Sequence, residues 1–270
     1  MSGSRAQASD GRSAPSAGLG SRDAGVGESR DAGVREPRTA REIERLGGRY
    51  GLDPQAGAQL ACLVDSLVSD THAPTAVREP SRVVDDHLAD SLVAIELEEI
   101  RVAASIADIG SGAGLPGLPL AVARPEARVF LVESASRKCA YLEGLLARCS
   151  IANCEVIHAR VETWTSGRNR LDVVTARAVA ALPVVLEYAA PLLRVGGTLV
   201  AWRGRRDPDE DRAAADAAAA LGMGAVAIHR VHPYQDAEHR HLHVWVKALE
   251  TPARFPRRPG MAAKRPLGGR

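Results

Sequence analysis

The chain has 270 residues, a formal net charge of +2, and 45% hydrophobic and 25% charged residues, values typical of a soluble globular protein with one large core. No apolar run approaches the roughly 20 residues that a membrane-spanning helix needs. The N-terminus also lacks the apolar core of a signal peptide, so we expect a cytoplasmic protein without membrane contact.

Residues 1–38 consist mainly of Ser, Gly, Ala, Arg and Asp, and the hexapeptide SRDAGV occurs at 21–26 and again at 29–34. Such a segment buries too little apolar surface to offset the entropy lost on ordering, so we predict a disordered extension over 1–38. From residue 39 to about Ile100, apolar residues recur at helical spacing. This pattern predicts a small helical subdomain, a cap, over 39–100.

Between residues 101 and 250, strand-like and helical patterns alternate. Apolar runs rich in β-branched residues predict strands at 103–109, 128–133, 154–158, 171–175, 197–202, 224–231 and 241–247, and helical patterns lie at 115–123, 136–149 and 182–193. This alternation predicts an α/β fold with a mostly parallel sheet covered on both faces. The short link around Pro233 allows only an antiparallel final pair, a layout that resembles the Rossmann-like sheet of class I methyltransferases.

A glycine-rich loop, ADIGSGAGLPG at 107–117, lies between the first predicted strand and the first predicted helix of this sheet. Glycine is needed where the backbone turns with positive φ or where a ligand lies against bare main chain. A helix that starts after such a loop offers free N–H groups. We therefore expect a nucleotide-like ligand to rest on Gly110, Gly112 and Gly114.

Two acidic positions follow the next predicted strands. Glu133 ends the second strand, about 20 residues beyond the loop, and a carboxylate there can accept hydrogen bonds from both hydroxyls of a ribose. The alternative is an exposed charge at a strand end. Arg160, Val161 and Glu162 follow the third strand, where a short loop can frame an adenine. Since the carboxyl ends of parallel strands meet at one edge, these positions predict an adenosine site.

Arginines follow the fourth and fifth predicted strands. Arg177 can pair with a carboxylate of the cofactor or with an RNA phosphate, and the structural alternative is a salt bridge that closes the strand end. Arg203 lies at the corresponding place after the fifth strand. Both arginines are therefore candidates for binding an anionic group.

Three histidines, His239, His241 and His243, alternate with other residues along the last predicted strand. Because no carboxylate or cysteine lies at a convincing spacing, we predict a solvated face opposite Leu242, Val244 and Val246 rather than a metal site.

The chain has four cysteines, and none forms the CxxC pair of a zinc site. We therefore expect reduced, partly buried thiols in a cytosolic protein and no bound metal. The four are Cys62, Cys139, Cys149 and Cys154.

The C-terminal segment 251–270 is a basic tail with six cations and no acid, which leaves the rest of the chain at a net charge of −4. A basic, Pro- and Gly-rich tail can contact RNA phosphates, and the alternative is a solvated, solubilising tail.

These motifs together closely resemble the RsmG or GidB family of bacterial 16S ribosomal RNA guanine-N7 methyltransferases. The resemblance rests on 108–127, VES at 132–134, RVE at 160–162, LDVVTARAVAAL at 171–182 and GGTLVAWRG at 196–204. Upstream, HLADSL at 87–92 is similar to a helical element of that family, and the basic tail is similar as well. The resemblance spans residues 40 to 267.

The resemblance implies transfer of a methyl group from S-adenosylmethionine to N7 of a guanosine in the 530 loop of 16S rRNA, in the small ribosomal subunit. Carried over by position, the cofactor contacts fall on Gly110, Leu115, Val161, Glu162 and Arg177. We expect RNA contacts at Arg177, Arg203, Arg257, Arg258, Lys264 and Arg265. Guanine N7 has a free lone pair, so we expect alignment of the reactants and no catalytic side chain that deprotonates the target.

The chain departs from the family pattern at three places. Asp86 replaces an arginine, residues 69–75 lack the usual aromatic, Asn and Leu-Thr run, and Arg203 with Gly204 replaces Lys-Gly. A methyltransferase with another substrate, a nicotinamide-dependent oxidoreductase and a non-catalytic small-subunit assembly factor remain alternatives. The sequence also leaves open whether naked rRNA or the assembled subunit is bound. It does not determine the oligomeric state, for which a monomer is the expectation.

Overall fold

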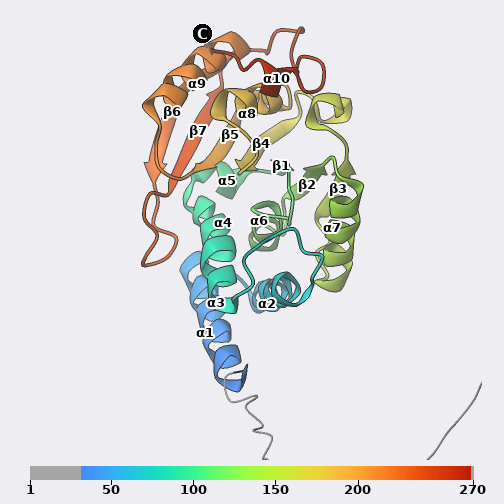
Figure 1. Cartoon of the computed structure of the whole chain (residues 1–270), viewed down its shortest axis with the longest axis vertical. Coiled ribbons are helices and arrows are strands. Elements are labelled where there is room, and N and C mark those ends of the chain that lie inside the picture. The colour runs from blue at the N-terminus through green and yellow to red at the C-terminus, as the bar shows by residue number, and fades with distance from the viewer. Residues whose placement is uncertain (1–31, 269–270) are drawn as a thin grey trace, which may run out of the picture.

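The computed structural model describes residues 32–268, in which a seven-stranded sheet lies between two helical layers (Figure 1). The strand order is β3-β2-β1-β4-β5-β7-β6. The strands are β1 (Ser105–Ile109), β2 (Arg128–Glu133), β3 (Cys154–His158), β4 (Leu171–Arg177), β5 (Leu193–Arg203), β6 (Met223–Arg230) and β7 (His241–Lys247).

The strand directions confirm the predicted α/β fold class. Strands β1 to β5 pair in parallel, and β7 runs antiparallel to both of its neighbours, β5 and β6. In this register Ile109 lies beside Val132, and Asp108 lies beside both Leu131 and Thr175. The carboxyl ends of β1, β2 and β4 therefore meet at one edge of the sheet, where open α/β sheets bind their ligands.

Helices that connect parallel strands cover both faces. α6 (Gly117–Ala123) and α7 (Ser136–Arg148) pack on one face, and α8 (Leu182–Ala189) and α9 (Pro208–Leu221) pack on the other. Each layer has its own apolar core, with Leu118 and Leu142 in the first and Leu186 and Leu221 in the second. Between β3 and β4 the structure has only the short 3-10 turns η3 (Val161–Thr163) and η4 (Thr165–Gly167).

The N-terminal helices share a layer and a core with α6 and α7. Leu60, Leu88 and Leu92 are fully buried in the same apolar cluster as Leu131 of β2, and α2 and α4 both pack on α6. The segment comprises α1 (Ala32–Tyr50), α2 (Pro54–Ser69), α3 (Pro80–Val83), the π-helix η1 (Val84–Ala89), α4 (Asp90–Leu92), the 3-10 helix η2 (Val93–Glu96) and α5 (Glu98–Val102).

The predicted disordered extension is too long at its C-terminal end. Helix α1 begins at Ala32, so residues 32–38 are helical, whereas residues 1–31 lie outside the described residues. The prediction relied on the lack of large apolar side chains. Residues 32–38 belong to the same helix as the buried Ile43 and Leu46, which anchor its later turns in the core.

The expectation of reduced thiols is wrong for two of the four cysteines. Cys62 of α2 and Cys149, which follows α7, form a disulfide with a Cα–Cα distance of 5.6 Å, whereas Cys139 and Cys154 are free. The two bonded residues are 87 positions apart in sequence. The packing of α2 on α7 brings them together, and this contact has no signature in the local cysteine spacing.

Reduction of this disulfide is expected to lower the free energy of unfolding by about 2–4 kcal/mol, because the bond closes a long loop in the unfolded chain. Denaturant titrations with and without reductant measure the change, and a Cys149→Ser variant should show no response to reductant. A thiol count on the denatured, unreduced protein should give two thiols. A count of four would contradict the disulfide.

His243 is buried, contrary to the predicted solvated histidine face, and both of its ring nitrogens lack a hydrogen-bond partner among the described residues. The expectation was wrong because α9 covers this face of β7 and the apolar pattern did not reveal α9. Burial lowers the pKa of His243 to about 4, and Asp211 of α9, 3.9 Å away, offsets only part of this effect. The imidazole is therefore neutral at pH 7.

The neutral, buried His243 predicts a loss of stability in acid. The unfolded histidine binds a proton near pH 6.5, whereas the folded one does so only near pH 4, so stability falls as pH drops between these values. The loss attributable to this residue should reach about 3 kcal/mol. Urea titrations between pH 7.5 and 4 give the free energy of unfolding of the wild type and of His243→Leu. The difference between the two free energies should change with pH by the predicted amount. The half-exposed His241→Leu is the control, and a pH-independent difference for His243→Leu would contradict the assignment.

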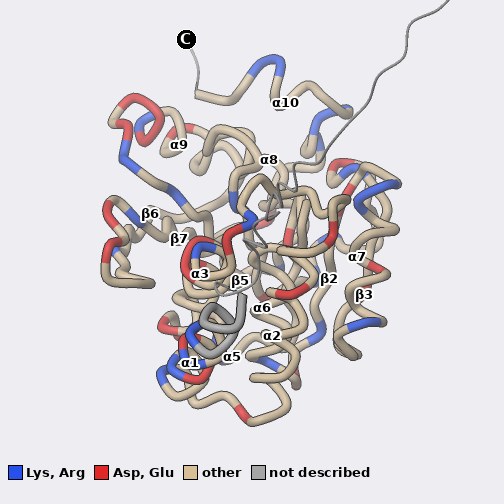
Figure 2. Tube along the Cα trace, turned by 60° about the horizontal axis from the view of Figure 1, so that its bottom comes forward, with Lys and Arg blue, Asp and Glu red and all other residues tan. Residues whose placement is uncertain are grey.

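The basic tail packs on the layer of α8 and α9. Phe255 and Ala262 are buried, and the tail includes the short helix α10 (Met261–Lys264). Figure 2 shows basic positions around α10 with few acidic ones beside them. Within residues 32–268, no helix is both long and apolar enough to cross a membrane.

Candidate active site

The glycine loop connects β1 to α6 through backbone turns that need glycine. Gly110 has φ +68°, and Gly114 has φ +87°, where an added Cβ would lie 2.2 Å from the Leu118 side chain. The N–H groups of Gly110 and Ser111 donate to the carbonyl of Val132, at 2.8 and 3.2 Å. These bonds fasten the loop to the end of β2, and they hold Gly110 at the carboxyl edge of the sheet.

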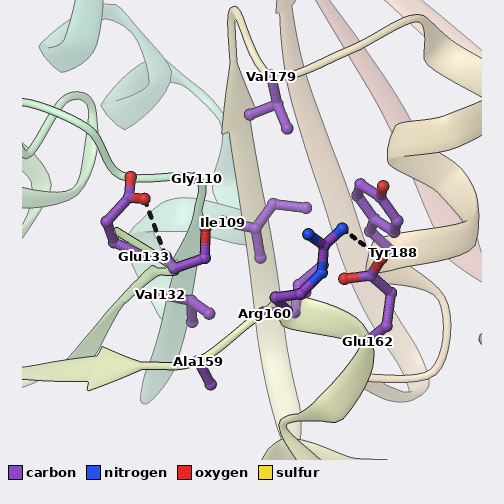
Figure 3. A pocket seen from close by; sticks show the side chains of 11 residues that line it. Ile109, Gly110, Val132, Glu133, Ala159, Arg160, Glu162, Val179 and Tyr188 are labelled. Carbon is purple, nitrogen blue, oxygen red and sulfur yellow. Dashed lines mark hydrogen bonds and ion pairs between the residues drawn. The ribbon is translucent and has the colours of Figure 1, made fainter. Parts of the chain in front are cut away.

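A cavity of about 130 Å³ lies at this edge, next to the loop (Figure 3). Glu133 stands on one side of the cavity, and Arg160, Glu162 and Tyr188 stand on the other. The lining residues are Ile109, Gly110, Val132, Glu133, Ser134, Ala159, Arg160, Val161, Glu162, Val179 and Tyr188.

Glu133 is 6% exposed and binds three backbone amides. Its Oε1 accepts hydrogen bonds from Ser134 at 2.8 Å and Ala135 at 2.9 Å, and its Oε2 accepts one from Gly112 at 3.1 Å. A buried carboxylate that accepts several amide bonds is held in one orientation. Its oxygens have further lone pairs with which to accept hydrogen bonds from a ligand.

Glu162 forms the opposite wall and is held by the C-terminal tail. Its Oε1 accepts hydrogen bonds from the Gly260 amide at 2.9 Å and from Arg160 at 3.2 Å. Burial opposes ionisation of this carboxyl, but the hydrogen bonds and the Arg160 charge outweigh burial and keep its pKa below the usual value. The carboxyl groups of Glu133 and Glu162 therefore both face the cavity, which disfavours a ligand with a phosphate inside it.

Asp108, the first residue of the DIGSGAG motif, is fully buried beneath the loop. Its Oδ1 accepts from Thr175 at 3.0 Å and its Oδ2 from the Gly117 amide at 3.2 Å. Burial raises the pKa of Asp108 to about 6 despite these bonds. The residue joins β1, β4 and the start of α6, and it does not line the cavity.

Arg177 lies at the end of β4 and forms a salt bridge, the structural alternative to ligand binding that the sequence left open. Its Nη1 donates to Asp90 Oδ2 at 2.9 Å and to the Asp86 carbonyl at 3.2 Å. The ion pair therefore links β4 to the N-terminal helices. Burial and the nearby Arg177 charge lower the pKa of His87, which keeps that ring neutral at pH 7.

The structure brings together only part of the predicted cofactor set. Gly110, Glu133, Val161 and Glu162 line the cavity, whereas Gly112, Gly114, Leu115 and Arg177 lie outside its lining. Sequence reasoning missed Tyr188 and Asp90. Nothing in the sequence singles out Tyr188, but Asp90 is a charged residue between apolar positions of one helical segment, a pattern that signals a buried charge with a partner.

The predicted RNA contacts divide into two groups. Arg177, Arg203 and Arg257 are engaged in ion pairs, with Asp90, Glu210 and Glu187 respectively. Arg258, Lys264 and Arg265 of the tail are exposed. Among residues 32–268, no three His, Cys, Asp or Glu side chains gather closely enough to hold a metal ion.

Comparisons with known proteins identify the family. The family model GidB, described as "rRNA small subunit methyltransferase G", matches residues 64–242. A Rubrobacter xylanophilus protein named "Ribosomal RNA small subunit methyltransferase G" is 43% identical over 198 residues, 71% of this chain and 76% of the relative. A protein of the same name from Chloroflexus aggregans is 42% identical over 215 residues, 78% of this chain and 90% of the relative.

Solved structures share the fold at low sequence identity. The S-adenosylmethionine-dependent methyltransferase SibL has a TM-score of 0.52 at 12% identity, covering 81% of this chain and 77% of that one. An S-adenosylmethionine-dependent O-methyltransferase from Thermotoga maritima has a TM-score of 0.50 at 14% identity, covering 70% and 72%. Family model, relatives and fold agree: the chain belongs to the GidB family, described as rRNA small subunit methyltransferase G.

Proposed function

We propose that this chain transfers a methyl group from S-adenosylmethionine to N7 of a guanine in the 530 loop of 16S rRNA. The observation that carries the proposal is the cavity between Glu133 and Glu162 beside the glycine loop, in a chain of the GidB family. Methylation of the small-subunit rRNA places the protein in the cytoplasm, on ribosomal RNA or on the small subunit.

The residues around the cavity fit S-adenosylmethionine. Glu133 can accept hydrogen bonds from both ribose hydroxyls, and Val161 and Glu162 can frame the adenine. The cavity volume of about 130 Å³ is below that of typical ligand pockets, so it encloses the adenosine end only. The methionyl end then lies along the loop, past Gly112, Gly114 and Leu115.

The chemistry requires little proton transfer from the protein. Bound S-adenosylmethionine supplies an electrophilic methyl group, and guanine N7 has an in-plane lone pair and no proton to lose. Residues of this chain therefore act by orientation, and the loop fixes the cofactor at the carboxyl edge of the sheet. The target base must be exposed in a loop or displaced from its stack.

Recognition of RNA by this chain rests on exposed cations. Arg258, Lys264 and Arg265 are free to bind phosphates, whereas Arg203 and Arg257 would first have to leave the carboxylates of Glu210 and Glu187. We therefore assign the phosphate contacts to the exposed residues of the tail.

Transfer of labelled methyl to small ribosomal subunits that lack N7-methylguanosine tests this function, with naked 16S rRNA as a parallel substrate. Label at N7 of a 530-loop guanosine is the expected result. Label elsewhere would assign another substrate, and no label despite cofactor binding would favour an assembly factor. Binding is read from thermal melts: S-adenosylmethionine at 100 times its Kd should add about 2.7 kcal/mol, and NAD nothing.

A further inference from the structure

The carboxylate of Asp90 joins three parts of the molecule and has an exposed fraction of only 6%. Its Oδ2 accepts a hydrogen bond from Arg177 of β4 at 2.9 Å, and its Oδ1 lies 3.3 Å from Nε of Arg240, in the link between β6 and β7. Its backbone carbonyl accepts a bond from the Trp202 indole at 2.7 Å. Asp90 therefore fixes the ends of β4 and β5 and the β6–β7 link to the N-terminal helices.

Arg177 is held through one nitrogen only. Both of its hydrogen bonds use Nη1, while Nε and Nη2 have no partner among the described residues. Neither nitrogen is among the fully buried polar atoms that lack a hydrogen-bond partner in the described residues. Both nitrogens are therefore accessible to solvent. A guanidinium anchored at one nitrogen presents its remaining donors in a fixed fork, the arrangement that recognises a carboxylate.

The strand register places Arg177 beside the glycine loop. The β1–β4 pairing ends at Asp108 and Thr175, so Arg177, two residues further along β4, lies at the same carboxyl edge of the sheet as the loop and the cavity. The Arg177 side chain is 16% exposed. A recessed guanidinium suits a small carboxylate, whereas the phosphate of an RNA chain needs a more open approach.

The other charges near Asp90 leave this part of the site positive. Asp90 is shared by Arg177 and Arg240, and Asp86 pairs with Arg82 at 2.7 Å, accepts a bond from the Tyr234 hydroxyl at 2.7 Å and lies 3.8 Å from Arg240. The cluster of three arginines and two aspartates has a formal net charge of +1. An incoming anion is therefore attracted to Arg177 even while the ion pair is intact.

We propose that Asp90 is a positioning residue, which holds Arg177 so that its free donors bind the methionyl carboxylate of S-adenosylmethionine. This inference rests on the proposed function. The residue acts through Arg177 and touches neither the transferred methyl group nor the target base.

The test compares two ligands in the full chain carrying Asp90→Asn. S-adenosylmethionine has the carboxylate, whereas methylthioadenosine has the same adenosine with a neutral thioether sulfur and lacks the amino-acid chain that carries the carboxylate. We expect S-adenosylmethionine to bind about tenfold more weakly to the variant, with methylthioadenosine binding unchanged. Arg177→Gln should show the same split, and the double variant should be no worse than either single one.

Asp85→Asn is the matched control. It alters a carboxylate on the same helical segment that has no hydrogen bond or ion pair with Arg177, Arg240 or Asp90 among the described residues, so both affinities should stay unchanged. If Asp90→Asn does not fold, Asp90→Glu keeps the charge and displaces it by one methylene, and it should weaken S-adenosylmethionine selectively.

Equal weakening of both ligands would reduce Asp90 to a structural role and overturn the proposal. Unchanged affinities for both ligands would overturn it too. If RNA methylation alone falls while both affinities are unchanged, Arg177 binds an RNA phosphate instead, and the proposal is also overturned. If the wild type binds S-adenosylmethionine and methylates rRNA, any of these results concerns Asp90 alone. A wild type that binds neither ligand would instead contradict the proposed function.

Discussion

Replacing Glu133 with glutamine is expected to weaken binding of S-adenosylmethionine by about 10- to 100-fold, since charge-assisted hydrogen bonds contribute about 1.5–3 kcal/mol. Glutamine keeps the size of the side chain but has one acceptor oxygen and no charge. It cannot hold the Ser134, Ala135 and Gly112 amides and two ribose hydroxyls together. Isothermal titration calorimetry measures the change in Kd.

The control for this prediction is Glu155→Gln on the neighbouring strand β3. Glu155 is exposed and pairs with Arg128, away from the cavity. Its replacement should leave the Kd unchanged. Equal affinity of Glu133→Gln and the wild type for S-adenosylmethionine would show that the ribose does not bind at this carboxylate.

Arg257→Ala is expected to lower the free energy of unfolding by about 3–5 kcal/mol, the cost of leaving a buried carboxylate without its cation, with only the backbone amide of residue 257 still bound to it. Glu187 on α8 is fully buried, and Arg257 donates to it from its backbone amide at 3.0 Å and from Nε at 2.8 Å, with a further bond from Nη2. Denaturant titration at pH 7 measures the loss.

Two further variants test whether the loss of stability comes from the buried Glu187 charge or from a general disturbance of the tail. Arg258→Ala changes the next residue, which is exposed, and should alter stability by less than about 0.5 kcal/mol. Replacing both Arg257 and Glu187 with leucine removes the two charges together and should recover most of the lost stability. A mild effect of Arg257→Ala alone would contradict the assignment of Arg257 as the partner that stabilises buried Glu187.

The sheet was largely predictable because its strands are apolar, β-branched runs separated by clear helical patterns. The predicted boundaries at 128–133, 154–158 and 241–247 match β2, β3 and β7. Helix α9 was missed because three of its four buried positions are alanines, which do not stand out as an apolar stripe; the four are Ala214, Ala217, Ala218 and Leu221. The same omission made His243 appear solvated.

The candidate site was predictable where the backbone itself determines the geometry. A glycine loop and a carboxylate at the ends of adjacent parallel strands must lie at one edge, and Gly110 and Glu133 do so. The partners of Arg177 and Arg257 could not be derived, because Asp90 and Glu187 lie on helices whose packing no local pattern encodes. The Cys62–Cys149 bond eluded prediction for the same reason.

The hydrogen bond from Gly260 to Glu162 makes completion of the cavity a late event in synthesis of the chain. The backbone amide that holds Glu162 in place is synthesised 98 residues after Glu162 itself, and later still than Glu133 and the glycine loop. Domains fold as units as the chain emerges, so a nascent chain has the sheet before it has a finished cavity. A chain that terminates before Phe255 would keep most of the core but would lack the Gly260 amide that orients Glu162. Such a truncated chain is expected to fold and yet to bind the cofactor poorly.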